Sequence, residues 1–303
     1  MITRIDDTVT YMVMASILQD VYDWDEDGDS GQFRLKKMRG YMRVLWLQAA
    51  ALCVGLGVAS SAYTADIAPG IPEAKVVQSE SGWTYTAAPY FWAAGLSGDM
   101  AQFGLPEVHI DADFGDILDN LDFAFMAAGE ARYERFSIFA DIMYTKLGAD
   151  ANTRRGILAD SVDVTSKTFA GLLGAGYSVL ENQSGHLDIV GGVRVWSVDT
   201  TISFNGGLFG GREADDGATW VDALAGVRGN YFFTPEVYVT GWGLVGGGGA
   251  DVDWDVSLAL GYKFTDTISA VAGYRAVGVN YDNDGFVFDV VEQGPIIGVA
   301  FHF

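Results

Sequence analysis

Cysteine, proline and basic residues are scarce in this chain of 303 residues. It has one cysteine and six prolines, and 18 lysines and arginines stand against 40 aspartates and glutamates, which gives a formal net charge of −22. A single cysteine excludes a disulfide scaffold and a cysteine-based zinc site. The acidic balance argues against nucleic-acid binding, which needs a basic surface. Because half of the residues are hydrophobic and 13% are aromatic, the chain is also too apolar for a disordered protein.

Residues 34–62 have the three parts of a secretory signal peptide. The basic residues that begin it are Arg34, Lys36, Lys37, Arg39 and Arg43. Residues 44–58 are uncharged and apolar but too few to span a bilayer comfortably, so a short membrane anchor is the weaker alternative. Ser60, Ser61 and Ala62 then supply the small residues that a signal peptidase requires. We interpret 1–33 as an upstream extension, disordered or preceding the true start, and 63–82 as a periplasmic N-terminal segment.

After residue 82 the sequence alternates with a period of two. In residues 256–264 the even positions are apolar or aromatic and the odd positions are small or charged, and segments 123–134 and 187–196 repeat this pattern. A period of two indicates strands with unlike faces. After the signal peptide, only residues 116–121 have the pattern of a helical turn. We therefore predict an all-β domain over 83–303.

The polar faces of these strands carry ionisable residues of both signs in nearly equal numbers, which favours an enclosed network over a solvated face. The predicted lumen charge network is Glu130, Arg132, Glu134, Asp141, Asp188, Arg194, Asp222, Arg228, Lys263, Arg275 and Glu292. Aromatic residues gather near the expected strand ends: Trp83, Tyr85, Tyr90, Phe91, Trp92, Tyr133, Phe136 and Tyr144. An apolar outside, a polar inside and aromatic girdles are typical of a transmembrane β-barrel.

The carboxyl terminus supports this interpretation. Residues 298–303 form an alternating strand that ends on Phe303, and this resembles the terminal strand of Gram-negative outer-membrane β-barrels. The resemblance implies Sec-dependent export, recognition of Phe303 by the barrel-assembly machinery, and contact with outer-membrane lipid and lipopolysaccharide. Residues 114–122 and 273–275 are also similar to an uncharacterised proteobacterial group of such barrels, which implies no particular activity.

We predict an antiparallel up-and-down barrel of ten strands. The strands are expected at 83–98, 121–134, 136–150, 160–180, 186–204, 216–232, 236–249, 251–264, 267–282 and 285–303. Residues 108–114 also alternate and would extend the first hairpin, so eight or twelve strands are the alternatives. Bacterial barrels place short turns in the periplasm and long loops outside, which puts the turns after residues 134, 181, 232 and 264 on the periplasmic side.

Candidate chemistry is sparse because the chain has only three histidines. His186 and His302 are expected to be solvated and structural, respectively. His109 alternates with Asp111 and Asp113, so the three share one strand face. Outer-membrane proteases of the omptin kind activate water with such residues, and a carboxylate beside an imidazole raises its basicity. The alternative is a polar strand that faces water, and no catalytic residue is assigned.

The remaining acidic residues are expected to crown the extracellular rim: Asp99, Glu107, Asp111, Asp113, Asp116, Asp119, Glu213, Asp215, Asp216, Asp251, Asp253, Asp255, Asp282 and Asp284. Clustered carboxylates suit weak binding of Ca²⁺ or Mg²⁺, and a solvated rim that repels anions is the alternative. No other cofactor is expected. For function, the sequence favours a structural role or a narrow, porin-like passage for small solutes. An omptin-like hydrolase around His109 and a surface recognition or adhesion protein are the alternatives.

Overall fold

The computed structural model describes residues 82–152 and 159–303. The predicted extension (1–33), signal peptide (34–62) and all but the last residue of the periplasmic segment (63–82) lie outside the described residues. Within these residues, no helix is long and apolar enough to cross a membrane.

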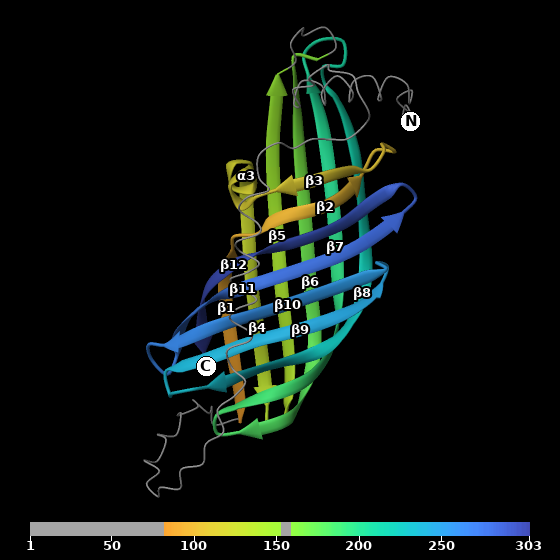
Figure 1. Ribbon diagram of the computed structural model, residues 1–303. Coiled ribbons are helices and arrows are strands. Elements are labelled where there is room, and N and C mark those ends of the chain that lie inside the picture. Colours follow the sequence, from red (N-terminus) through yellow and green to blue (C-terminus); the bar gives the residue numbers. More distant parts are fainter. Residues whose placement is uncertain (1–81, 153–158) are drawn as a thin grey trace, which may run out of the picture. The chain divides into compact units, whose positions relative to one another are not determined.

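The strands form one antiparallel sheet that closes on itself (Figure 1). Ten strands make the closed barrel, because the first of them pairs with the second and also with the last. Their bounds are β1 (Trp83–Trp92), β4 (Leu121–Tyr133), β5 (Phe136–Asn152), β6 (Ser161–Asn182), β7 (Gly185–Asn205), β8 (Arg212–Phe232), β9 (Val237–Gly248), β10 (Val252–Lys263), β11 (Ile268–Asn283) and β12 (Phe286–His302). The predicted ten-stranded barrel is confirmed.

Two further strands continue the first one. β2 (Gly95–Ala101) follows β1 after a break at Ala93 and Ala94, and it pairs with the upper half of β12 while β1 pairs with the lower half. β2 then turns into β3 (Val108–Ala112), and the short helix α3 (Phe114–Asp119) leads into β4. The predicted extension of the first hairpin by residues 108–114 is thus present over residues 108–112, since residue 114 begins α3, and it does not change the number of strands in the barrel.

The four short turns predicted after residues 134, 181, 232 and 264 lie together at one end of the barrel. The first strand begins and the last strand ends at this same end. The backbone of Phe303 forms hydrogen bonds with Tyr85 in both directions, at 3.1 and 2.9 Å. The opposite end is not made of long loops alone. Asp284 and Gly285 connect β11 to β12 with φ angles of 51° and 85°, which is the left-handed geometry of a two-residue type I′ hairpin that Asp-Gly favours.

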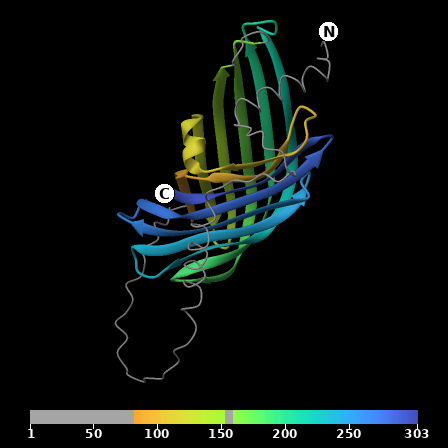
Figure 2. The ribbon, with the colours of Figure 1, turned by 45° about the horizontal axis from the view of Figure 1, so that its top comes forward.

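The barrel wall has unequal height (Figures 1 and 2). β6, β7 and β8 have 22, 21 and 21 residues, whereas β9 and β10 have 12 each. Pairing of β8 with β9 begins only at Asp222, so the first part of β8 extends beyond the shorter wall. We call this extension the upper sheet and define it as residues 148–152, 161–169, 197–205 and 212–219.

The outer face changes character where the upper sheet begins. On β7, Leu187, Ile189 and Val193 point outward and are 38%, 58% and 49% exposed. The next outward positions along the strand include Ser197 and Thr201, which are polar. Near the turns, the exposed aromatic residues are Tyr85, Tyr133, Phe136, Tyr177, Tyr231, Phe233, Tyr262, Phe264 and Phe303. An apolar band with an aromatic girdle is the surface that a barrel presents to lipid.

Candidate functional site

The centre of the barrel is filled by a charged network around Arg275 of β11. Its guanidinium is 1% exposed and lies 2.8 Å from Asp141 Oδ1 and 2.7 Å from Asp255 Oδ2, both through Nη2. Its Nε donates to Asp255 Oδ1 at 3.1 Å, and its Nη1 donates to the hydroxyl of Tyr90 at 2.6 Å. These partners come from β1, β5 and β10, so one side chain ties together strands on different sides of the lumen.

A second arginine extends the network upward. Arg194 of β7 donates to Asp253 at 2.6 Å and to Asp255 at 2.5 Å, so Asp255 is shared by two guanidinium groups. Two indole N–H groups also donate hydrogen bonds to these carboxylates. Trp196 donates to Asp253 at 2.9 Å and Trp242 donates to Asp255 at 2.8 Å. Charge-assisted hydrogen bonds of this kind are the strongest that side chains make.

The prediction that Asp253 and Asp255 lie on the extracellular rim is wrong. Both are fully buried, because β10 begins at Val252 and its odd positions face the lumen from there onward. The predicted strand, 251–264, already contains both residues, and their odd positions continue the small and charged face of residues 256–264. Asp251, which precedes the strand, is exposed as predicted.

A separate cluster of charges lies nearer the short turns. Arg132 of β4 donates through Nε to Glu130 at 2.9 Å and also pairs with Asp188 of β7. Asp188 accepts a further hydrogen bond from Ser178 at 2.6 Å, and Arg228 of β8 pairs with Glu130. The predicted lumen network therefore forms two clusters, one around Arg275 and one around Glu130 and Asp188.

The other predicted network residues lie outside these ion pairs. Glu134 is exposed in the turn after β4, with a φ of 49°, and does not belong to the interior. Lys263 is half-buried, with its ammonium 5.6 Å from the ring centroid of Phe232. Asp222 is fully buried and accepts a hydrogen bond from the backbone N–H of Ala250 at 2.9 Å. Glu292 is half-buried on β12.

Aromatic side chains fill the lumen above the Arg275 network. Trp196 and Trp220 stack with centroids 6.0 Å apart, and Trp220 stacks on Tyr281 at 4.1 Å. Trp92 is 4% exposed and belongs to the same cluster. Trp92 and Tyr90 were predicted for a girdle, and this is wrong. Alternate positions of β1 face opposite sides, so of Tyr90, Phe91 and Trp92 only Phe91 points outward.

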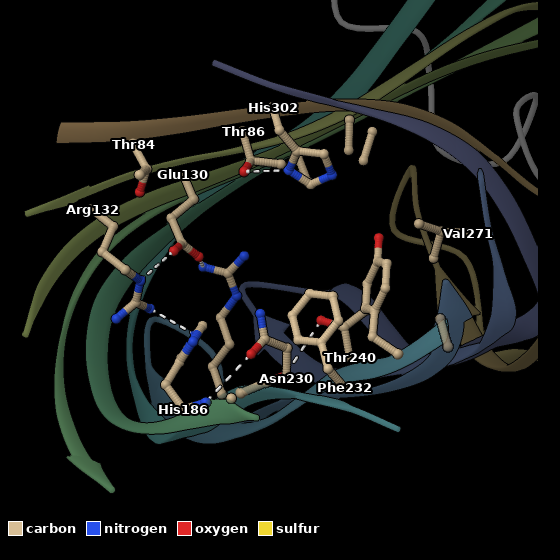
Figure 3. A pocket seen from close by; sticks show the side chains of 18 of the residues that line it. Thr84, Thr86, Glu130, Arg132, His186, Asn230, Phe232, Thr240, Val271 and His302 are labelled. Carbon is tan, nitrogen blue, oxygen red and sulfur yellow. Dashed lines mark hydrogen bonds and ion pairs between the residues drawn. The ribbon is translucent and has the colours of Figure 1, made fainter. Parts of the chain in front are cut away.

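The hairpin β2–β3 covers the inner face of the upper sheet. Phe103, at its tip, has a φ of 58°, and its backbone N–H donates to Asp216 of β8. Its side chain packs against a cluster formed by Val162 and Ile202. A cavity of about 430 Å³ lies at the short-turn end of the lumen, below the Arg275 network and beside the cluster around Glu130, which forms part of its lining (Figure 3).

The residues of the predicted hydrolase site do not converge. His109 Nδ1 lies 2.8 Å from Asp99 Oδ1 across the β2–β3 pair, and the two side chains are 65% and 51% exposed. Asp111 lies opposite Ser97 in the same pair. Asp113 caps α3 by accepting from the N–H of Asp116 at 3.0 Å. Among the described residues, no group of three or more His, Cys, Asp or Glu side chains could hold a metal ion.

A serine and a histidine that sequence reasoning did not connect lie together near the short turns. Ser269 Oγ is 2.8 Å from His302 Nε2, and Thr86 Oγ1 is 3.3 Å from the other ring nitrogen. Tyr238 covers Ser269 with its hydroxyl 3.0 Å away, and Ser269 is fully buried. A covered hydroxyl cannot attack a substrate, so this contact stabilises the strand ends. Residues 33 positions apart meet here only because β11 and β12 pair.

Comparisons with known proteins agree with this architecture. No protein-family model and no curated protein sequence matches the chain. The outer-membrane protease OmpT from Escherichia coli has a similar structure, with a TM-score of 0.50, 11% identity, and 74% of this chain and 98% of that chain covered. The attachment invasion locus protein Ail of Yersinia pestis is more distant, with a TM-score of 0.32, 11% identity, and 73% and 99% covered. Neisserial surface protein A has a TM-score of 0.31, 16% identity, and 74% and 98% covered. The chain therefore has the fold of outer-membrane β-barrels.

Proposed function

We propose that this protein is a closed, non-conducting outer-membrane barrel with a structural role, which anchors the upper sheet beside the membrane. The observation that supports this most is the network of Arg275, Asp141 and Asp255, which crosses the lumen at the height of the apolar band. Barrels of this size have an interior just wide enough for side chains to fill. A solute would have to separate buried ion pairs, and removing one partner of such a pair costs about 3–5 kcal/mol.

The aromatic cluster above the network supports the same choice. Trp220 and Tyr281 stack across the lumen with an interplanar angle of 12°, and Trp196 is 1% exposed. Phe103 and the rest of its hairpin then cover the upper sheet from inside. These three successive obstructions favour the structural role over a narrow passage.

Single-channel recording in planar lipid bilayers tests this proposal. We expect the refolded wild-type chain to insert without steady current steps, because the Arg275 network and the aromatic cluster fill the lumen. A matched variant, Arg275→Ala with Trp242→Ala, should show brief, irregular currents, since it removes two of the side chains that fill the lumen. Steady, reproducible steps from the wild-type chain would overturn the proposal and favour solute passage.

A surface recognition role is the second candidate, and the polar outer face of the upper sheet favours it. The outward residues there include Ser203, Glu213 and Asp215, and the described residues place no strand beside residues 212–219 on the β9 side. Cells that express a Ser203→Ala, Glu213→Ala, Asp215→Ala variant should then attach less to one another or to coated surfaces. Equal attachment by the variant and by a Glu181→Gln control at the opposite end would exclude recognition through this face.

A further inference from the structure

The cavity at the short-turn end is a gap in an otherwise filled lumen. It measures about 430 Å³, within the range of small-molecule sites. The gap exists because small side chains line it at four inward positions: Ala88 of β1, Ala128 of β4, Ala259 of β10 and Ala300 of β12. One level higher the same lumen is closed by Arg275, Tyr90 and Trp242, which form the roof of the cavity.

The two sides of the cavity differ in chemistry. Arg132, Glu130 and His186 lie on one side, where dashed contacts join them (Figure 3). Phe232 and Val271 lie on the opposite side (Figure 3), and Ile296 extends this apolar wall toward the roof. A ligand that fits must therefore combine an apolar body with at least one polar group.

The charges of the lining identify that polar group. Arg132 and Arg228 are compensated by Glu130 and Asp188. Lys263 also lines the cavity, is half-buried, and forms no ion pair with any described residue. Its ammonium lies 5.6 Å from the ring centroid of Phe232.

The mouth of the cavity has the opposite sign, since Glu134, Glu181 and Asp266 line it. These carboxylates are exposed, so water and salt screen them, and Arg135 lies 3.8 Å from Glu181. The surplus positive charge inside the mouth is therefore that of Lys263.

We propose that this cavity binds a small organic anion, with its carboxylate at Lys263 and its apolar body against Val271, Ala259 and Ile296. The carboxylate would give Lys263 the counter-ion that the described chain does not supply, and a half-buried ammonium gains more from such a partner than an exposed one. The apolar body would cover the alanine-lined wall and remove that surface from water. The ligand enters from water at the short-turn end, which bacterial barrels place in the periplasm.

Calorimetry with 2-naphthoate tests the site. The folded chain is reconstituted in lipid nanodiscs, and the heat from empty nanodiscs is subtracted. We expect saturable binding of one 2-naphthoate per chain and much weaker binding of 2-naphthol, which has the same rings without the carboxylate. Lys263→Gln should weaken 2-naphthoate binding about tenfold or more, because it removes the charge-assisted hydrogen bond to the carboxylate.

Two further variants separate the site from non-specific effects. Lys167→Gln removes an exposed lysine of the upper sheet and should leave the affinity unchanged. Ala259→Phe fills the cavity and should abolish binding, and heat-modifiable gel mobility shows whether each variant is folded. The proposal is overturned if wild type gives no saturable heat beyond empty nanodiscs, if 2-naphthol binds equally well, or if folded Lys263→Gln binds as tightly as wild type.

Discussion

At the scale of single residues, the molecule depends on ionised side chains that are hidden from water. Arg275, Arg194, Asp253 and Asp255 are each at most 1% exposed. Removing charges of this kind from water costs several kcal/mol per ion, and only good geometry with further hydrogen bonds offsets that cost. Here Asp255 accepts from two guanidinium groups and from the indole of Trp242. Such a network is sensitive to the loss of any one member.

Arg275→Met should therefore destabilise the barrel strongly. The substitution leaves Asp141 without its guanidinium partner and leaves Asp255 with one guanidinium instead of two. We expect the free energy of unfolding to fall by about 3–5 kcal/mol, as measured by urea titration of the chain in lipid vesicles. The matched control is Arg135→Gln, whose partner Glu181 is 3.8 Å away in an exposed turn, and its effect should be below about 1 kcal/mol. Equal effects of the two substitutions would contradict this view of the network.

A substitution at Phe303 should affect assembly of the barrel in cells without affecting the stability of the folded chain. Its side chain is 60% exposed, while its backbone forms two hydrogen bonds with Tyr85 that any residue could make. If assembly machinery recognises the terminal aromatic side chain, Phe303→Ala should lower the amount of folded, heat-modifiable protein in cells. The midpoint of unfolding of the purified variant should stay close to that of wild type. A normal cellular level of folded variant would remove the assembly role.

The sequence predicted the charged interior only in part, for a reason that Asp253 illustrates. Arg194 and Arg275 were assigned to the lumen because they lie within clear alternation. Asp253 and Asp255 lie at odd positions of the predicted strand 251–264, in phase with its small and charged face, but their place near the first residue of the strand led to their assignment to the rim. The partners of Arg275 come from positions 134 and 20 residues away, and strand periodicity alone carries no information about such pairings.

At the scale of the secondary-structure elements, alternation predicted the ten barrel strands and their four short turns. It did not predict the break at Ala93 and Ala94, where pairing with β12 passes from β1 to β2. Small residues such as these two alanines are compatible with a break in a strand, but they also occur within continuous strands and so do not predict one. The predicted strands 267–282 and 285–303 already implied a tight connection between β11 and β12, and the structure places it one residue later, as a type I′ turn at Asp284 and Gly285.

The outer face of β7 provides a test at this scale. Val193 points outward at 49% exposure between Leu173 and Ala223 of the neighbouring strands, whereas Thr201 lies in the upper sheet. Val193→Arg should lower the free energy of unfolding in lipid vesicles by about 2–4 kcal/mol, because a charge on the lipid face loses hydration. Thr201→Arg should change it by less than about 1 kcal/mol. A small effect at Val193 would show that this face does not meet lipid.

At the scale of the whole molecule, the barrel has distinct levels along its axis. A cavity lined in part by the cluster around Glu130 lies at the short-turn end, followed by the Arg275 network, the aromatic cluster and finally the upper sheet. The apolar outer band surrounds the charged levels, and the polar outer face begins at the upper sheet. Conduction, ligand binding and recognition are therefore expected from different levels, and each can be tested separately.

The central claim is that the apolar band lies in the outer membrane and that the upper sheet stands at the cell surface. It is tested most directly by labelling single cysteines on the outer face of β7 in intact cells with a membrane-impermeant maleimide. The single natural cysteine, Cys53, lies in the predicted signal peptide and is replaced by serine. We predict that Ser203→Cys reacts in intact cells and that Val193→Cys reacts only after the membrane is dissolved. Labelling of Val193→Cys in intact cells, or of Ser203→Cys only after the outer membrane is permeabilised, would contradict the account.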